Sequence, residues 1–338
     1  MKFLRITYLF FLLLLCTGCT NLLKTEDSNL TVSAQAVVID NYDGYAGQGR
    51  KISQTFEKAP EKVLAVSGSV VDNLVFLGLE KQIAATAACT TDSAFPEAKV
   101  YSKFPSLTDN YKYPSKEAVL KLKPDMIVSW GSLFGDSALG SVSYWHGKEI
   151  HTYVLSNTVP VKSSGSRTLQ NIIIDLRNLI KIFRLDSNAS RKVDDLQYRL
   201  EVLKNRRLEF SNRGRTPKIL TIQYVYGNEY LGRTSTDLTS DIIIQAGGMS
   251  LDDTVGGKRS IEFLIEKNPD IIMIVDMPSR PGKAKIDALK HNPLLKNVEA
   301  VRHDNFFLIP YRAFYGGSVY SIEATEHLHS FIQQCFRG

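Results

Sequence analysis

The sequence predicts an α/β fold of two Rossmann-like lobes, each with a central, mostly parallel sheet, joined by one long α-helix. Short apolar runs alternate with segments of helical periodicity, a pattern typical of a parallel sheet covered by helices. A stretch in the first half of the chain is similar to a stretch in the second half, and a long amphipathic segment lies between them. The length of 338 residues also suits two hydrophobic cores.

Residues 1–18 have the layout of a secretory signal peptide: a basic start, then an apolar run that is too short for a permanent transmembrane helix. The sequence Cys-Thr-Gly-Cys that ends at Cys19 resembles a bacterial lipobox, although Cys16 stands where Leu is usual. We therefore expect Cys19 to be the lipidated first residue of the mature protein, with an ordinary cleaved signal peptide as the alternative. Such an anchor would hold the protein on the extracytoplasmic face of a bacterial membrane.

Residues 19–48 are expected to form a polar tether and the start of a β-hairpin. The turn-rich stretch 41–49 contains three glycines and is flanked by two strand-like runs, 34–39 and 51–56. The N-terminal lobe then follows over residues 49–186.

The internal repeat relates residues 115–130 to residues 260–275. The two stretches, SKEAVLKLKPDMIVSW and SIEFLIEKNPDIIMIV, align without a gap. Identical positions in this alignment are Ser115/Ser260, Glu117/Glu262, Pro124/Pro269, Asp125/Asp270 and Ile127/Ile272. Each copy predicts a short helix, a Pro-Asp turn and a buried strand, because Pro cannot continue a helix. A matching pair of strands, 62–66 and 218–222, precedes the copies, so the second lobe is predicted over residues 214–338.

The segment 187–213 has the pattern of one long helix between the lobes. Its apolar residues, three or four positions apart, form a single stripe. The stripe consists of Val193, Leu196, Leu200 and Leu203. Ser187 can cap the start and Gly214 can end the helix. About 24 residues at 1.5 Å each span about 36 Å, the width of a small domain.

The composition argues against several functional classes. The net charge of +6 is mild, and no Lys/Arg-rich block contains interleaved aromatic residues, so we expect no nucleic acid partner. The sequence Ser67-Gly68-Ser69 lacks the pattern of a nucleophile elbow, and no catalytic constellation stands out, so we expect neither enzymatic activity nor a cofactor. Cys89 and Cys335 could pair outside the cytoplasm or stay free.

Several stretches in the order of the chain resemble the substrate-binding lipoproteins of ABC importers for iron–siderophore complexes, haem and cobalamin. These stretches are residues 58–83, 117–127, 241–248, 262–270, 292–301 and 305–310. The resemblance covers about residues 50–335. It implies a monomer with a ligand cleft between two α/β lobes, joined by a rigid helix. The implied ligand is a metal chelate, in the first place a ferric siderophore, with cobalamin or haem as the alternative.

A bare Zn²⁺ or Mn²⁺ ion is a less favoured ligand. A zinc site needs about four His, Cys or carboxylate ligands, and the six histidines show no spacing that would gather them. Haem would need an axial ligand, for which His146 or a tyrosine of the cleft is available.

The resemblance also implies docking on the transmembrane subunits of an ABC permease, whose ATPase lies on the cytoplasmic side. In the family, one glutamate per lobe meets arginines of the permease, and the matching positions are Glu117 and Glu262. Carboxylate–guanidinium pairs are directional, so two equivalent glutamates suit a pseudo-symmetric partner.

Candidate ligand-binding residues follow the predicted strands, because ligands of α/β sheets lie beyond the carboxyl ends of the strands. Arg can bind anionic groups in bidentate fashion, and Tyr and Trp offer stacking area. The candidates are Trp130, Tyr224, Arg233, Arg312 and Tyr315, then Trp145, Ser67 and Tyr226. Both tryptophans are expected near the cleft. Tyr311 and Arg312 are expected on an extended segment, so that only one of them faces the ligand.

Overall fold

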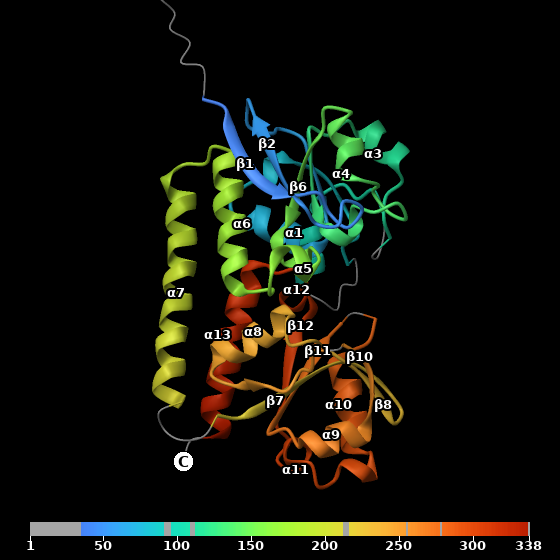
Figure 1. Cartoon of the computed structure of the whole chain (residues 1–338), viewed down its shortest axis with the longest axis vertical. Coiled ribbons are helices and arrows are strands. Elements are labelled where there is room, and N and C mark those ends of the chain that lie inside the picture. The colour runs from blue at the N-terminus through green and yellow to red at the C-terminus, as the bar shows by residue number, and fades with distance from the viewer. Residues whose placement is uncertain are drawn as a thin grey trace, which may run out of the picture. The chain divides into compact units, whose positions relative to one another are not determined.

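The computed structural model describes residues 35–90, 96–108, 112–211, 216–254, 256–277 and 279–336, and the residues from Gln35 onward form one compact unit (Figure 1). The signal peptide, Cys19 and most of the tether that the sequence predicts lie outside the described residues. None of the helices within these ranges is long and apolar enough to cross a membrane.

The N-terminal lobe is built on a four-stranded parallel sheet in the order β4-β3-β5-β6. Its strands are β3 (Val63–Val66), β4 (Ile83–Ala87), β5 (Met126–Trp130) and β6 (His151–Leu155). All four residues of β3 are buried, because helices cover both faces of the sheet. The helices of one face are α1 (Gly68–Phe76) and α6 (Leu169–Ile182), and those of the other face are α3 (Lys116–Leu122) and α4 (Val142–His146).

The predicted hairpin is present as β1 (Val37–Tyr42) and β2 (Lys51–Phe56), paired antiparallel. Two buried side-chain amides of the hairpin complete the edge of the parallel sheet at β6. Asn41 exchanges hydrogen bonds with the backbone of Val154 at 3.0 and 2.7 Å, and Gln54 does the same with Thr152 at 2.8 and 3.1 Å. The hairpin therefore satisfies backbone groups that an edge strand would otherwise expose.

The C-terminal lobe has a mixed sheet in the order β10-β8-β7-β11-β12, with β9 paired to β7. Its strands are β7 (Lys218–Tyr226), β8 (Glu229–Gly232), β9 (Met249–Ser250), β10 (Gly257–Ser260), β11 (Ile271–Asp276) and β12 (Phe306–Pro310). The β7, β9, β11 and β12 pairs are parallel, whereas β8 and β10 add antiparallel strands at one edge. The helices here are α8 (Leu238–Ala246), α9 (Ile261–Lys267), α10 (Gly282–Lys290), α11 (Glu299–Arg302), α12 (Tyr311–Phe314) and α13 (Val319–Cys335). The predicted fold class is confirmed.

The internal repeat is present in three dimensions as α3–β5 in one lobe and α9–β11 in the other. The aspartate of each Pro-Asp turn accepts backbone hydrogen bonds at the start of the neighbouring parallel strand, β3 in one lobe and β7 in the other. Asp125 accepts from the N–H groups of Glu61 and Lys62 at 2.7 and 2.9 Å, and Asp270 accepts from the N–H group of Lys218 at 2.8 Å. This shared contact explains why the aspartate is identical in both copies.

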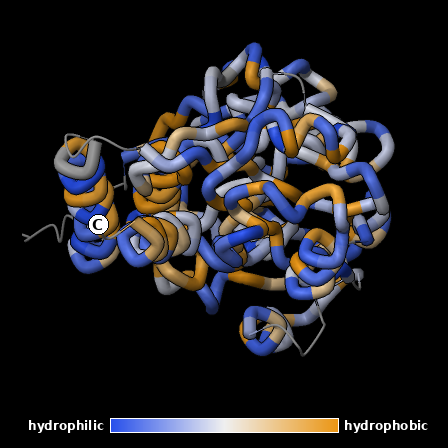
Figure 2. The backbone as a smooth tube through the Cα atoms, turned by 90° about the horizontal axis from the view of Figure 1, so that it is seen from below, coloured by the Kyte–Doolittle hydropathy of each residue, from blue (hydrophilic) through white to orange (hydrophobic). Residues whose placement is uncertain are grey.

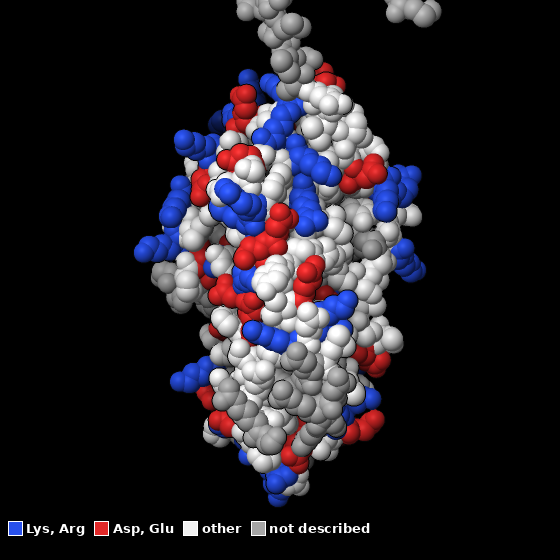
Figure 3. Space-filling model, turned by 90° about the vertical axis from the view of Figure 1, so that its left-hand side faces the viewer, with Lys and Arg blue, Asp and Glu red and all other residues white. Residues whose placement is uncertain are grey.

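Helix α7 (Ser187–Ser211) runs along both lobes and packs on α6, α8 and α13 (Figure 1). The apolar stripe from Val193 to Leu203 is buried, and Figure 2 shows the helices of this side almost end-on, with hydrophilic and hydrophobic residues around each. Arg199 donates to both carboxylate oxygens of Glu326 on α13, at 2.9 and 2.6 Å. The face that carries α7 shows intermixed charges of both signs (Figure 3). These contacts attach α7 along its length to elements of both lobes.

Candidate ligand-binding cleft

A pocket that opens to solvent lies between the two lobes, with about 340 Å³ of empty space when its open part is included. Three lining residues stand at the carboxyl ends of parallel strands: Ser67 follows β3, Trp130 is the last residue of β5, and Tyr311 follows β12. The lining residues are Ser67, Gly68, Ser69, Ala88, Thr90, Glu97, Tyr101 and Trp130 from the first lobe, and Tyr311, Arg312 and Tyr315 from the second. The cleft thus occupies the position at which α/β sheets bind ligands.

A buried ion pair between Asp72 on α1 and Arg312 on α12 crosses from lobe to lobe at this pocket. Arg312 donates through Nε and Nη2 to the two carboxylate oxygens of Asp72, and the distance from Nε is 3.1 Å. The side chain of Asp72 is 0% exposed and that of Arg312 is 12% exposed. Tyr101 donates a further hydrogen bond to Asp72 at 3.1 Å, and the guanidinium of Arg312 lies 3.4 Å from the ring centroid of Tyr320. A bidentate, stacked pair of this kind is directional and largely shielded from solvent.

The burial of Asp72 affects its ionisation. Desolvation raises the pKa of its carboxyl to about 6, although Arg312 and Tyr101 act in the opposite direction. The ionised form of Asp72 is therefore maintained in the fold only with the help of Arg312.

Trp130 and Tyr315 meet across the cleft. Their ring centroids are 4.8 Å apart with a tilt of 55°, and the indole N–H of Trp130 donates to Ser69 Oγ at 2.8 Å. Gly316 has a φ of +79°, and a Cβ atom there would lie 2.6 Å from the indole nitrogen. A side chain at this position would strain the backbone and collide with the tryptophan, so glycine is required for this approach.

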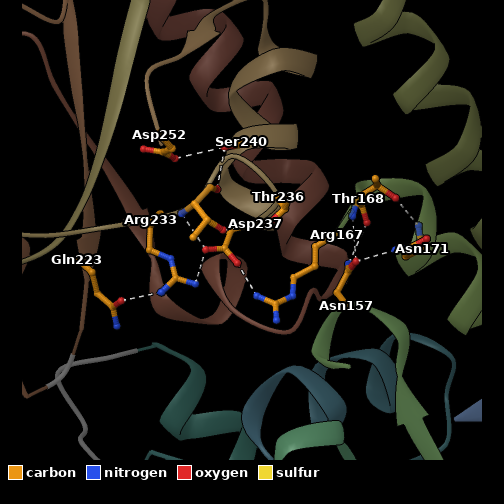
Figure 4. Close-up of polar contacts among 11 residues, drawn as sticks. Asn157, Arg167, Thr168, Asn171, Gln223, Arg233, Thr236, Asp237, Ser240 and Asp252 are labelled. Atoms are coloured by element: carbon orange, nitrogen blue, oxygen red, sulfur yellow. Dashed lines mark hydrogen bonds and ion pairs between the residues drawn. The ribbon is translucent and has the colours of Figure 1, made fainter. Parts of the chain in front are cut away.

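A second ionic contact crosses between the lobes beside the cleft (Figure 4). Asp237, at the start of α8, pairs with Arg167 of the first lobe through Oδ1 and with Arg233 of its own lobe at 2.9 Å through Oδ2. Arg233 also donates to Gln223 at 3.0 Å, and its guanidinium lies 5.7 Å from the ring centroid of Tyr315. The carboxylate of Asp237 is thus shared between two arginines.

The structure gathers some of the predicted site residues and separates others. Ser67, Trp130, Arg312 and Tyr315 line the cleft, and Arg233 stands next to Tyr315. Both Tyr311 and Arg312 line it, because they lie on the short helix α12 and not on an extended segment.

Tyr224 and Tyr226 lie outside the cleft lining, in a separate cluster at the end of β7. Their ring centroids are 5.9 Å apart, and the guanidinium of Arg280 lies 4.7 Å from the first ring and 5.3 Å from the second. Lys285 lies 5.5 Å from the ring of Tyr224.

The expected place of Trp145 near the cleft is wrong. Its side chain is fully buried in the core of the first lobe, where its indole N–H donates to the carbonyl of Leu139 at 3.0 Å. Residues 142–146 form the helix α4 and not a loop, which turns this apolar ring inward. His146 on the same helix pairs with Thr152 Oγ1 at 2.9 Å and faces the hairpin, so it does not line the cleft either.

Among the residues that sequence reasoning missed are Glu97 and Tyr101, which line the cleft, and Asp72, which pairs with Arg312 beside it. Asp72 left one signal in the sequence, because it is an acidic residue close to the apolar residues Val70, Val71 and Leu74 of a predicted helix. Cys89 and Cys335, whose pairing the sequence left open, are both free thiols.

We expect Arg312→Met to destabilise the protein by about 3–5 kcal/mol at pH 8, because Asp72 would remain buried without its cation. The folded pKa of Asp72, about 6, exceeds the unfolded value, so the contribution of this group to stability is present at low pH and is lost as the pH rises through 6. Without Arg312 that pKa rises further, so the variant should lose less stability at pH 5 than at pH 8. Urea denaturation at both pH values measures this difference.

The double variant Asp72→Asn/Arg312→Met serves as the control. It removes the unpaired carboxylate, so it should be more stable than Arg312→Met at pH 8 and should lose the extra pH dependence. Equal losses for Arg312→Met at pH 5 and pH 8 would contradict a buried, charge-dependent contact.

Comparison with known proteins agrees with this architecture. The sequence model of a family described as periplasmic binding protein matches residues 63–313. No curated protein sequence matches the chain significantly. Among solved structures, a periplasmic binding protein from Veillonella parvula is 20% identical with a TM-score of 0.75, over 88% of this chain and 92% of that chain. The "ABC-type Fe3+-hydroxamate transport system" from Saccharomonospora viridis is 16% identical with a TM-score of 0.68, over 88% and 98%.

A periplasmic heme binding protein from Pseudomonas aeruginosa is 19% identical with a TM-score of 0.65, over 82% of this chain and 94% of that chain. At these identities the structural neighbours establish a common fold. The match of residues 63–313 spans both sheets and the helix between them. The chain therefore belongs to the periplasmic binding protein family.

Proposed function

We propose that the protein is the lipid-anchored solute-binding component of an ABC importer, and that it delivers a metal chelate, in the first place a ferric siderophore, to the permease. The observation that carries this proposal is the aromatic cleft between the lobes, at the carboxyl ends of β3, β5 and β12.

Periplasmic binding proteins work outside the cytoplasm and catalyse no reaction, so the chain is not an enzyme.

The chemistry of the cleft suits a bulky chelate. Tyr101, Trp130, Tyr311 and Tyr315 provide flat apolar surface with polar edges, which favours stacking against an organic shell around a metal. The volume of about 340 Å³ includes space that is open to solvent, so a chelate of siderophore size would remain partly exposed at the mouth of the pocket. Proteins of similar structure include an Fe3+-hydroxamate transport protein, a heme binding protein and a vitamin B12 binding protein of Vibrio cholerae, which supports this ligand class.

Haem or cobalamin is the second candidate ligand. The tyrosines of the cleft, Tyr311 and Tyr315 among them, could supply an axial ligand to haem iron, whereas His146 lies elsewhere. Within the described ranges, no group of three or more His, Cys, Asp or Glu side chains is placed to hold a bare metal ion.

We also propose that Glu117 and Glu262 dock the protein on its permease. They stand at equivalent positions near the starts of α3 and α9, and both side chains are exposed. The backbone N–H of Glu117 and the hydroxyl of Ser115 lower the pKa of Glu117, and the hydroxyl of Ser260 and its own N–H lower that of Glu262. Both carboxylates therefore stay ionised and available to arginines of a pseudo-symmetric partner.

Each of these glutamates is followed three residues later by an exposed aliphatic side chain. Leu120 is 36% exposed and Ile265 is 40% exposed. Residues three apart share one face of a helix, so each lobe offers the same pair of an acid and an aliphatic group.

Ligand binding should quench the fluorescence of Trp130 and not that of Trp145, because only Trp130 lines the cleft. Titration of residues 20–338 with ferric hydroxamates, ferric catecholates, ferric citrate, haem and cobalamin measures the quenching. Trp145→Phe should retain a saturable signal, and Trp130→Phe should lose most of it and weaken binding by about tenfold or more. Saturable binding of a chelate with an unchanged signal in Trp130→Phe would place the ligand elsewhere.

The double variant Glu117→Lys/Glu262→Lys should reduce uptake of the radiolabelled chelate about tenfold or more, because two docking contacts become repulsive. The measurement uses cells in which this protein is the sole binding protein for that chelate. Ligand affinity of the purified variant should be unchanged, and Glu80→Lys, an exposed substitution away from α3 and α9, is the matched control. Normal uptake by the double variant would refute docking through these residues.

A further inference from the structure

Glu97 is a buried acid in the wall of the cleft. It lies on α2 (Pro96–Tyr101), is 5% exposed and lines the pocket beside Tyr101. None of the ion pairs found among the described residues includes Glu97. Glu97 therefore lines the cleft without an ion-pair partner within the part of the chain that the structure describes.

The two arginines near the cleft, Arg312 and Arg233, form ion pairs with carboxylates other than that of Glu97. Arg312 uses Nε and Nη2 for Asp72 and stacks on Tyr320, and Arg233 pairs with Asp237 (Figure 4). The described lining residues include no lysine and no histidine. Because Asp72 and Arg312 balance each other, Glu97 is the acidic side chain of the described wall that has no ion-pair partner there.

Glu97 is also electrostatically coupled to the ion pair that crosses the cleft. The pKa of Asp72 is raised mainly by burial, and the neighbouring charge of Glu97 adds to that effect. An ionised carboxylate in a site of low polarity is unfavourable unless a cation or hydrogen-bond donors accompany it. A cationic group of a ligand can serve as the ion-pair partner of Glu97.

We propose that Glu97 recognises a cationic group of the ligand, so that the cleft selects iron chelates that carry an ammonium group over polyanionic chelates. This inference rests on the proposed function and narrows its substrate class. It departs from the sequence-based expectation that Arg312 and Arg233 bind an anionic chelate, because both arginines already have carboxylate partners.

A pair of matched chelates tests the charge directly. Ferrioxamine B is a ferric trihydroxamate with a free ammonium group, and its N-acetylated form has the same iron centre without that charge. A ferric tris-catecholate provides the polyanionic comparison. Isothermal titration calorimetry with the purified protein should give about tenfold weaker binding for the acetylated form, and weaker binding still for the catecholate.

Two variants of Glu97 test whether this side chain causes the preference for ferrioxamine B over its acetylated form. Glu97→Gln keeps the shape but removes the charge, so the difference between ferrioxamine B and its acetylated form should fall to less than about twofold. Glu97→Asp keeps the charge and should retain part of the preference. Glu80→Gln removes an exposed carboxylate away from the cleft and should behave like the wild type. Circular dichroism and thermal melts of each variant establish that it is folded.

The outcomes separate the inference from the proposed function. Tighter binding of the catecholate, or equal binding of the two ferrioxamines, would overturn the role of Glu97 and leave the siderophore proposal intact. If only haem or cobalamin binds, the siderophore proposal is wrong, and unchanged affinity in Glu97→Gln would overturn the inference as well. If no chelate of the panel binds, both are wrong.

Discussion

The buried pair of Asp72 and Arg312 is the contact on which the geometry of the cleft depends. It joins α1 of one lobe to α12 of the other, and both ends are locked by neighbours, Tyr101 on one side and Tyr320 on the other. In a site of low polarity, neither charge can leave the other without a large desolvation penalty. Together with the Arg167–Asp237 pair and the helix α7, which packs against elements of both lobes, it holds the two sheets in one arrangement.

This arrangement determines what the cleft can recognise. Trp130 and Tyr315 meet from opposite lobes and supply apolar surface, and the arginines at hand already have carboxylate partners. Selectivity then depends on Glu97, which has no ion-pair partner among the described residues, and on the aromatic rings that line the cleft with it. A preorganised wall of this kind adds little ordering cost on binding, because its side chains are held by contacts present before the ligand arrives.

Sequence patterns were sufficient for the features that depend on local periodicity and turn chemistry. The hairpin, the long helix and the two Pro-Asp repeats follow from residues close together in the chain, and the structure contains them all. The side-chain partners could not be predicted, because they come from distant elements: Arg312 and Asp72 are 240 positions apart. Trp145 was misplaced for a related reason, since an aromatic residue after a strand can face the core or the cleft, and only the tertiary packing of α4 decides.

Anomalous X-ray scattering at the iron edge would show whether a ferric chelate binds between the lobes of a frame held by Asp72 and Arg312. The measurement requires crystals of the protein in complex with the chelate that binds most tightly. We expect one iron peak in the cleft among Trp130, Tyr311 and Tyr315, with the Asp72–Arg312 pair intact. An iron peak outside the cleft, or one inside it with Arg312 turned from Asp72 to the chelate, would contradict this expectation.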